Sequence, residues 1–201
     1  MAAEPAVDRL DAVRTEFDVA AMLNLSGLSG RVDRVCELGA GTHECAECMI
    51  AALGVDVYEV YGTPGARLGQ WHGLPQVVMR PPYARSLVDT ESGSVDLVHA
   101  QQLFVRRPFV TVVGYLEEMI RVARPGGTVA FGAITEYCID DVVLRRWIDG
   151  DSTDCHVLPR AWTIDMLDRR GLTLLGSYVQ LITTGRSELL VFRKRQVRSV
   201  R

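Results

Sequence analysis

Short valine-rich runs alternate along the chain with segments of helical periodicity. The runs typical of strands are 31–38, 55–61, 75–80, 94–100 and 128–134. The segments that predict helices are 43–53, 112–123, 140–149 and 162–171. In the second of these, one face carries the apolar residues Val113, Leu116, Ile120 and Ala123. Two long β-rich runs, 172–183 and 187–195, close the sequence, and their short connection 184–186 predicts an antiparallel hairpin.

Buried, valine-rich strands separated by helices are typical of a mostly parallel sheet with helices on both faces. We therefore expect an α/β fold: a doubly wound, mostly parallel, seven-stranded Rossmann-like sheet with a C-terminal antiparallel strand pair. Ligands on such sheets bind outside the carboxyl ends of the strands, where the strand order reverses.

Composition and charge narrow the class of protein. The chain has 201 residues and a net charge of −3, which suits one globular domain and disfavours nucleic-acid binding. No apolar run has the length of a membrane span. The five cysteines are an odd number, and the N-terminus has no pattern of a signal peptide. We therefore expect reduced thiols and a cytoplasmic protein.

The segment "VCELGAGTHECAECM", residues 35–49, begins as a glycine-rich loop should after the first strand. Gly39 and Gly41 would let the backbone approach a ligand closely. A dinucleotide loop would have a third glycine at position 43, where this chain has His43. Glu37 would repel a pyrophosphate but would suit an ammonium group. S-adenosylmethionine carries an ammonium and a sulfonium and no phosphate, so charge complementarity favours it.

Several segments in order resemble class I S-adenosylmethionine-dependent methyltransferases. "VCELGAGT" resembles the first motif of that family and "SGSVDLVHAQQLF" its fourth-strand motif. "YLEEMIRVARPGGTVAF" is similar to the segment that leads into the fifth strand, and "MLDRRGLTLLGSY" with "ELLVFRKR" to the closing helix and strands. The resemblance covers residues 32–193 and implies a methyltransferase domain that binds S-adenosyl-L-methionine.

The resemblance implies a cofactor site with these members after the first and fourth strands: Glu37, Gly39, Ala40, Gly41, Thr42, His43, Ala100 and Gln101. The family usually has a ribose-binding acid at the end of the second strand, where this chain has Tyr61. Glu59 lies on the same strand face at ribose-binding spacing, so we favour it over Tyr61. After the third strand, the family often has an aspartate for adenine, and this chain offers Tyr83, Ala84 and Arg85 instead.

A helix over residues 8–23 is predicted, with one apolar face formed by Leu10, Val13, Phe17 and Ala20. In the family such a segment often covers the pocket, although a core-packing helix or a contact in a homodimer fits equally well. We expect residues 1–31 to form a helical cap, 32–193 the methyltransferase domain and 194–201 a basic tail.

The cysteines of the first loop and its flanks could form a metal site or could be ordinary packing residues. Cys36, His43, Cys45 and Cys48 are possible zinc donors. However, Cys36 lies in a strand, and a second Cys/His pair at zinc-finger separation is missing from the sequence. Buried reduced cysteine is an ordinary small apolar residue, so we predict no metal.

The predicted function is methyl transfer to a small-molecule acceptor, more specifically at a hydroxyl oxygen. His99 is the candidate general base, beside Gln101 and Gln102, and a buried core histidine is the alternative interpretation. Tyr137, after the fifth strand, is the second catalytic candidate. No nucleic-acid or membrane partner is expected. A non-enzymatic interaction protein of the same fold and an NAD(P)-binding oxidoreductase are the alternative functions.

Overall fold

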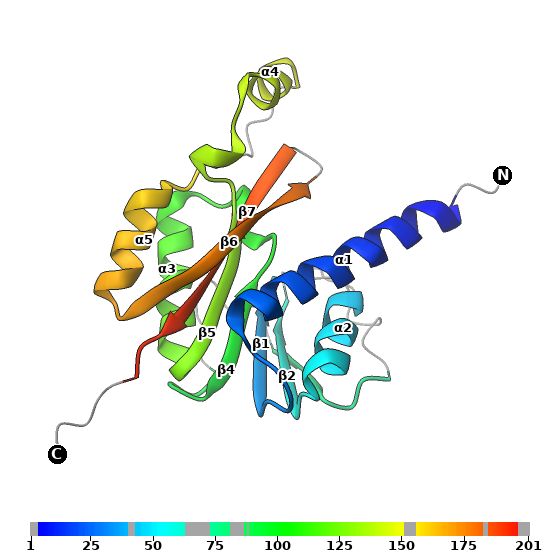
Figure 1. Cartoon of the computed structure of the whole chain (residues 1–201), viewed down its shortest axis with the longest axis vertical. Coiled ribbons are helices and arrows are strands. Elements are labelled where there is room, and N and C mark those ends of the chain that lie inside the picture. The colour runs from blue at the N-terminus through cyan, green and yellow to red at the C-terminus, as the bar shows by residue number, and fades with distance from the viewer. Residues whose placement is uncertain are drawn as a thin grey trace.

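The computed structural model is built around one twisted sheet (Figure 1). The residues that it describes are 4–39, 43–62, 73–80, 87, 89–150, 156–182 and 185–196, with the backbone alone for 4–13 and 43. The strand order is β3-β2-β1-β4-β5-β7-β6. The strands are β1 (Arg34–Leu38), β2 (Val57–Tyr61), β3 (Val77–Arg80), β4 (Val95–Ala100), β5 (Ala123–Ala133), β6 (Leu172–Ile182) and β7 (Gly185–Lys194).

The first five strands of the sheet run parallel, and β7 pairs antiparallel with both β5 and β6. The seven-stranded, doubly wound sheet with a C-terminal antiparallel pair is therefore confirmed. The strand order reverses between β1 and β4, which lie side by side in parallel register. This is the place where a sheet of this kind binds its ligands.

Helices cover both faces of the sheet. α1 (Glu4–Ser26) and α2 (His43–Leu53) pack on one face, and α3 (Phe109–Val122) and α5 (Arg160–Arg169) on the other (Figure 1). A short helix, α4 (Asp141–Asp149), stands apart from both layers. Two 3-10 turns, Leu103–Arg106 and Glu136–Cys138, follow β4 and β5. None of the helices that the structure describes combines the length and apolarity needed to traverse a bilayer.

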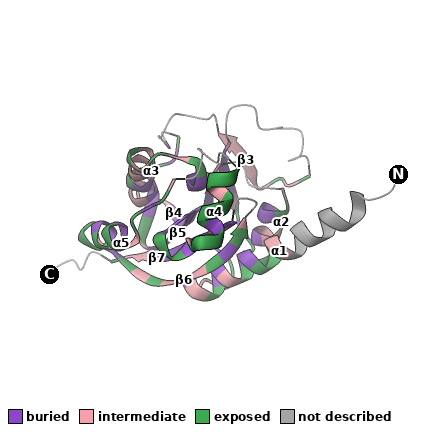
Figure 2. Cartoon of the chain, turned by 90° about the horizontal axis from the view of Figure 1, so that it is seen from above, coloured by how far each residue is buried: buried purple, intermediate pink, exposed green. Residues whose placement is uncertain are grey.

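The sheet separates two apolar clusters, and Figure 2 shows the buried residues gathered on the strands between exposed helix surfaces. Alternate residues of each strand face opposite clusters. On β1, for example, Val35 belongs to the cluster under α1 and α2, while Cys36 belongs to the cluster under α3 and α5. The inner parallel strands β1, β2 and β4 are buried on both faces, as their near-continuous apolar sequences predict, whereas the edge strand β3 is half-buried.

The apolar face predicted for the N-terminal helix is wrong. Phe17 is 67% exposed and Ala20 is also exposed, whereas Val19, Met22 and Leu23 are buried against the sheet. The side chains of Leu10 and Val13 lie outside the described residues. The helix turns a mixed face inward that includes a buried aspartate, Asp18, so hydrophobicity alone selected the wrong side.

Several element boundaries also differ from the prediction. α3 ends at Val122, and β5 begins at Ala123 rather than after the "RPGG" segment. The buried residues of α3 are Val112, Leu116, Met119 and Val122, so Leu116 is the one residue that they share with the face predicted from the sequence. The closing hairpin is confirmed, but its second strand begins at Gly185, which pairs with Ile182.

Gly132 near the end of β5 makes room for the chain that leaves β4. A Cβ at this position would lie 1.9 Å from the carbonyl oxygen of Gln101. The backbone of Gln101 therefore crosses directly over β5, and only glycine permits this approach. Gly176 on β6 also lies under a close neighbour, but there a Cβ would meet the end of the Leu25 side chain at 2.8 Å.

We predict that Gly132→Ala lowers the free energy of unfolding by on the order of 3 kcal/mol, because a backbone carbonyl cannot move away without breaking the β4–β5 register. Gly176→Ala is the matched comparison and should cost only about 1 kcal/mol, since the Leu25 side chain can rotate. Urea denaturation of both variants measures the difference. Equal losses would show that Gln101 is not fixed above Gly132.

Candidate functional site

The candidate site lies where β1 and β4 end side by side. Glu37 on β1 is level with His99 on β4, and both side chains lie on the face covered by α1 and α2. Gly39 follows β1 with a φ of +78°, a conformation that favours glycine. Its N–H donates to the carbonyl of Tyr61, and a Cβ there would lie 3.1 Å from the side chain of Leu103. The sharp turn out of β1 therefore needs glycine at this position.

A tyrosine hydroxyl connects the buried polar groups of this site. The hydroxyl of Tyr58 on β2 donates to Oε2 of Glu37 at 2.6 Å and lies 3.0 Å from Nε2 of His99. Glu37 is 2% exposed, and Tyr58 and His99 are fully buried. Burial raises the pKa of Tyr58 well above its usual range, and the nearby Glu37 raises it further. The hydroxyl therefore stays protonated and available as a donor.

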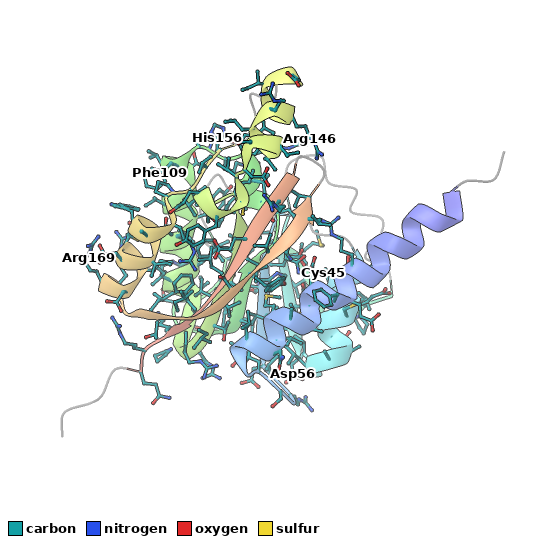
Figure 3. All side chains as sticks on the ribbon, turned by 45° about the horizontal axis from the view of Figure 1, so that its top comes forward. Cys45, Asp56, Phe109, Arg146, His156 and Arg169 are labelled. Carbon is teal, nitrogen blue, oxygen red and sulfur yellow. The ribbon has the colours of Figure 1, made fainter. Side chains whose placement is uncertain are left out.

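α2 and the end of β4 add a thiol and an amide. Cys45 is buried under α1 (labelled in Figure 3), and Nε2 of Gln101 lies 3.3 Å from its sulfur. Burial raises the pKa of the Cys45 thiol well above its usual value, and Glu37 adds to the effect. The Cys45 thiol in turn adds to the raised pKa of Tyr58. Cys45 is thus a protonated member of the polar cluster rather than a reactive thiolate.

Three possible metal ligands meet here, in a combination that differs from the one weighed from the sequence. Ligand atoms of Glu37, Cys45 and His99 all lie within 4.8 Å of one another. Cys36, by contrast, belongs to the cluster on the opposite face of the sheet, so it cannot join Cys45. Glu37 and His99 are hydrogen-bonded to the Tyr58 hydroxyl and Cys45 to Gln101, so all three residues have protein partners without an ion. The absence of a metal stays a prediction.

A second group of polar residues joins α1 to β6 beside this cluster. Asp18 is 7% exposed, and its side chain is hydrogen-bonded to Gln180. The hydroxyl of Tyr178 donates to the backbone carbonyl of Asp18 at 2.7 Å. Burial raises the pKa of Asp18, against the lowering effects of Gln180 and Arg14. The chain thus holds a carboxyl group of raised pKa over the end of β5.

Glu59 does not fit the ribose-binding role predicted for it. One carboxylate oxygen accepts from Nη2 of Arg80 at 2.6 Å and the other from the Thr90 hydroxyl at 2.7 Å. The residue is fully buried. Because Thr90 gives its only proton to Glu59, the Tyr61 hydroxyl donates to Thr90 in turn, at 2.7 Å. Glu59 therefore connects β2 to β3. Of the two residues considered for the ribose position, Tyr61 is the one at the end of β2.

His99 is poorly suited to the role of general base. Its ring is fully buried, and burial lowers its pKa to about 3. A neutral imidazole with such a pKa accepts a proton weakly at neutral pH. The acidic limb that an ordinary histidine would give near a pH of about 6.5 is therefore not expected. The alternative interpretation of His99 as a buried core histidine agrees with its surroundings.

Of the remaining predicted residues, the structure describes Tyr137 and Ala100 but not those of the loops. Tyr137 lies on the 3-10 turn after β5, is 68% exposed and packs its ring under the guanidinium of Arg160, 4.9 Å away. Ala100 is the buried last residue of β4. Ala40, Gly41, Thr42, Tyr83, Ala84, Arg85 and the side chain of His43 lie outside the described residues.

Comparison of the sequence with protein-family models gives no match, and comparison with curated proteins also gives none. Comparison of the structure is informative. Magnesium protoporphyrin IX methyltransferase from Synechocystis, solved with S-adenosylhomocysteine, is similar with a TM-score of 0.68 at 13% identity, over 92% of this chain and 83% of that one. A SAM-dependent methyltransferase from Methanosarcina mazei gives 0.66 at 13% identity, over 87% and 98%.

Geranyl diphosphate methyltransferase in complex with SAM is similar with a TM-score of 0.63 at 14% identity, over 89% of this chain and 85% of that one. At this level of identity the likeness concerns the fold alone. The chain has the methyltransferase fold. The fold class implied by the sequence motifs is thereby confirmed over nearly the whole length of the chain.

Within the methyltransferase fold, sequence reasoning missed Tyr58, Asp18, Tyr178 and Gln180. Tyr58 had a signal, because a tyrosine inside a buried strand needs a partner for its hydroxyl. That signal does not name the partner, which depends on the register between β1, β2 and β4. Tyr178 and Gln180 are neighbours on β6, whereas Asp18 lies far away in the sequence on α1, and only the packing of α1 against β6 brings it to them.

The lowered pKa of His99 predicts how stability depends on pH. Above a pH of about 6.5 the histidine is neutral in both states. Below that value the unfolded chain binds a proton that the folded chain refuses, so stability falls as the pH decreases toward the folded pKa of about 3. From pH 7 to pH 5 the loss from this residue should be about 2 kcal/mol. His99→Gln should remove this component, as urea denaturation at both pH values would show.

The matched control is His156→Gln, because the ring of His156 is only half-buried. That variant should keep the pH dependence of the wild-type protein. An unchanged slope in His99→Gln would contradict the assignment of the pH dependence to the buried ring.

Proposed function

We propose that the chain binds S-adenosylmethionine and transfers its methyl group to a small-molecule acceptor, at a hydroxyl oxygen. The observation that carries the proposal is the carboxylate of Glu37, held at the end of β1 directly below the turn at Gly39. The reversal of strand order between β1 and β4 puts this carboxylate at the usual ligand position of the fold.

The charge of the site selects among adenosyl ligands. A dinucleotide would bring its pyrophosphate to the loop after β1. Glu37 would repel that group, whereas it would attract the α-ammonium of S-adenosylmethionine. Gln101, at the end of β4, provides an amide beside the same position. The Glu37 carboxylate and the Gln101 amide thus fit a cationic, phosphate-free cofactor better than NAD(P).

S-adenosylmethionine itself supplies an electrophilic methyl group when bound. The residues of the chain therefore have to hold the cofactor and orient the acceptor. In this proposal Glu37 and the loop through Gly41 fix the donor. The cluster of Asp18, Tyr178 and Gln180 lies over the end of β5 on the acceptor side. We assign proton uptake from the acceptor hydroxyl to Asp18 rather than to His99. The raised pKa of Asp18 makes its carboxylate a better base than an ordinary aspartate.

Two of the similar structures support an acceptor of small-molecule size. They are named for magnesium protoporphyrin IX and geranyl diphosphate. A partner-binding protein of the same fold is the second candidate function. It is favoured by the exposed apolar side chains of α4 and the end of β6, among them Val142 (68%), Ile148 (68%) and Leu181 (69%).

Calorimetry with S-adenosylmethionine, S-adenosylhomocysteine and NAD tests the proposal. We expect both adenosyl ligands to bind and NAD not to bind. Glu37→Gln removes the charge at constant shape and should weaken S-adenosylhomocysteine binding by about 10-fold or more. Glu117→Gln, on the exposed surface of α3, is the control and should bind normally. Binding of NAD alone would support the oxidoreductase, and binding of none the partner-binding protein.

A further inference from the structure

A single hydroxyl group lies where four elements of the fold meet at the candidate site. Tyr58 on β2 is hydrogen-bonded to Glu37 on β1 and to His99 on β4, and Cys45 on α2 lies beside the same group. All four residues are at most 2% exposed. The rings of Tyr58 and His99 also meet edge to face, with their centroids 6.1 Å apart. Within the described part of the chain, the Tyr58 hydroxyl is therefore surrounded by the side chains of Glu37, His99 and Cys45.

The direction of each hydrogen bond follows from the chemistry of the groups. A carboxylate only accepts, so the single proton of the Tyr58 hydroxyl goes to Glu37. The oxygen of Tyr58 then accepts from Nε2–H of His99, which fixes the neutral tautomer with its proton on Nε2. In agreement with this tautomer, Nδ1 of His99 has no hydrogen-bond partner among the described residues.

A second arm of the network reaches the end of β4. Nε2 of Gln101 donates to the sulfur of Cys45, and the Cys45 thiol lies close enough to Tyr58 to affect the pKa of its hydroxyl. Both arms therefore meet at Tyr58, which donates to the carboxylate of Glu37. Each donor in the chain strengthens the next, because successive hydrogen bonds polarise one another in a buried environment.

We propose that Tyr58, oriented by His99, is a positioning residue that aims the Glu37 carboxylate at the ammonium group of the bound cofactor. This inference rests on the proposed function. Its physical basis is that a carboxylate in the interior is stable only where donors compensate for lost water. The neutral hydroxyl provides a donor without neutralising the charge, so Glu37 keeps its attraction for a cation. An arginine in the same place would cancel that attraction.

His99 would act as a hydrogen-bond donor to Tyr58, a role that its lowered pKa permits. A histidine that remains neutral over the physiological range is a constant donor to Tyr58. It holds the Tyr58 hydroxyl through this hydrogen bond, and because it stays neutral it does not compete with the ammonium group of the cofactor for Glu37. Removal of the imidazole should therefore weaken cofactor binding by releasing Tyr58. A side chain of similar length that can donate a hydrogen bond to Tyr58 should restore the binding.

Two ligands separate positioning of Glu37 from a general effect on the fold. S-adenosylhomocysteine carries the ammonium group, and 5′-methylthioadenosine has the same nucleoside and a thioether but lacks the amino-acid portion. We expect Tyr58→Phe to weaken binding of S-adenosylhomocysteine by about 10-fold or more and to change binding of 5′-methylthioadenosine less than about twofold. Calorimetry at pH 7 measures both. Tyr115→Phe, which removes a hydroxyl from α3 on the opposite face of the sheet, should change neither.

A pair of substitutions at His99 provides a second measurement. His99→Ala should reproduce the selective loss for S-adenosylhomocysteine, and His99→Gln should recover most of the affinity, because its amide can donate to Tyr58. Equal weakening of both ligands in Tyr58→Phe would show a merely structural role and overturn the inference. Unchanged binding of S-adenosylhomocysteine in that variant would do so as well.

Two further results would contradict the inference for other reasons: failure of the wild-type protein to bind either ligand, and the presence of zinc. If the wild-type protein binds neither ligand, the proposed function fails and this inference falls with it. If elemental analysis of the wild-type protein finds stoichiometric zinc that is lost in Cys45→Ala, then Glu37, Cys45 and His99 are metal ligands. In that case the cluster binds an ion, and the positioning role of Tyr58 is wrong.

Discussion

Burial of the Glu37 carboxylate inside the sheet is the constraint on which the candidate site depends. An ionised group removed from water costs several kcal/mol unless hydrogen-bond donors surround it. The structure meets this cost with the hydroxyl of Tyr58, which in turn requires His99 and Cys45 around it. One acidic residue on β1 thus accounts for the buried polar groups of Tyr58 on β2, His99 on β4 and Cys45 on α2, which lie beside the apolar cluster under α1 and α2.

Other buried carboxylates of the sheet are compensated differently. Glu59 is paired with Arg80, and Glu188 on β7 is paired with Arg160 at 2.8 Å. Burial acts to raise the pKa of Glu188, but hydrogen bonds from neighbouring hydroxyls and from Arg160 outweigh it and lower the pKa. These pairs connect strand to strand or strand to helix, and their charges cancel. The hydroxyl that meets Glu37 leaves its charge in place, which is what a cation-binding residue requires.

The N-terminal helix completes the site from above. α1 packs on α2, β6 and β7, and the close contact of Leu25 with Gly176 sets its height over the sheet. At this height Asp18 reaches Gln180, and the hydroxyl of Tyr178 reaches the backbone of α1. The helix therefore contributes both apolar side chains to the core and a carboxyl group to the acceptor side of the proposed site.

The sequence by itself determined the order of strands and helices, the antiparallel closing pair and the sharp turn after the first strand. These features follow from local periodicity and from turn residues such as Gly39, which act over a few positions of the chain. The partners of the polar side chains were decided by tertiary structure alone. Glu59 has suitable spacing for a ribose, yet the register of β2 with β3 gives it to Arg80. His99 ends a strand as a catalytic base would, yet the pairing of β1 with β4 buries it beside Tyr58. Spacing along one strand fixes which face a residue occupies, whereas its partners and its pKa depend on neighbouring strands that are distant in sequence.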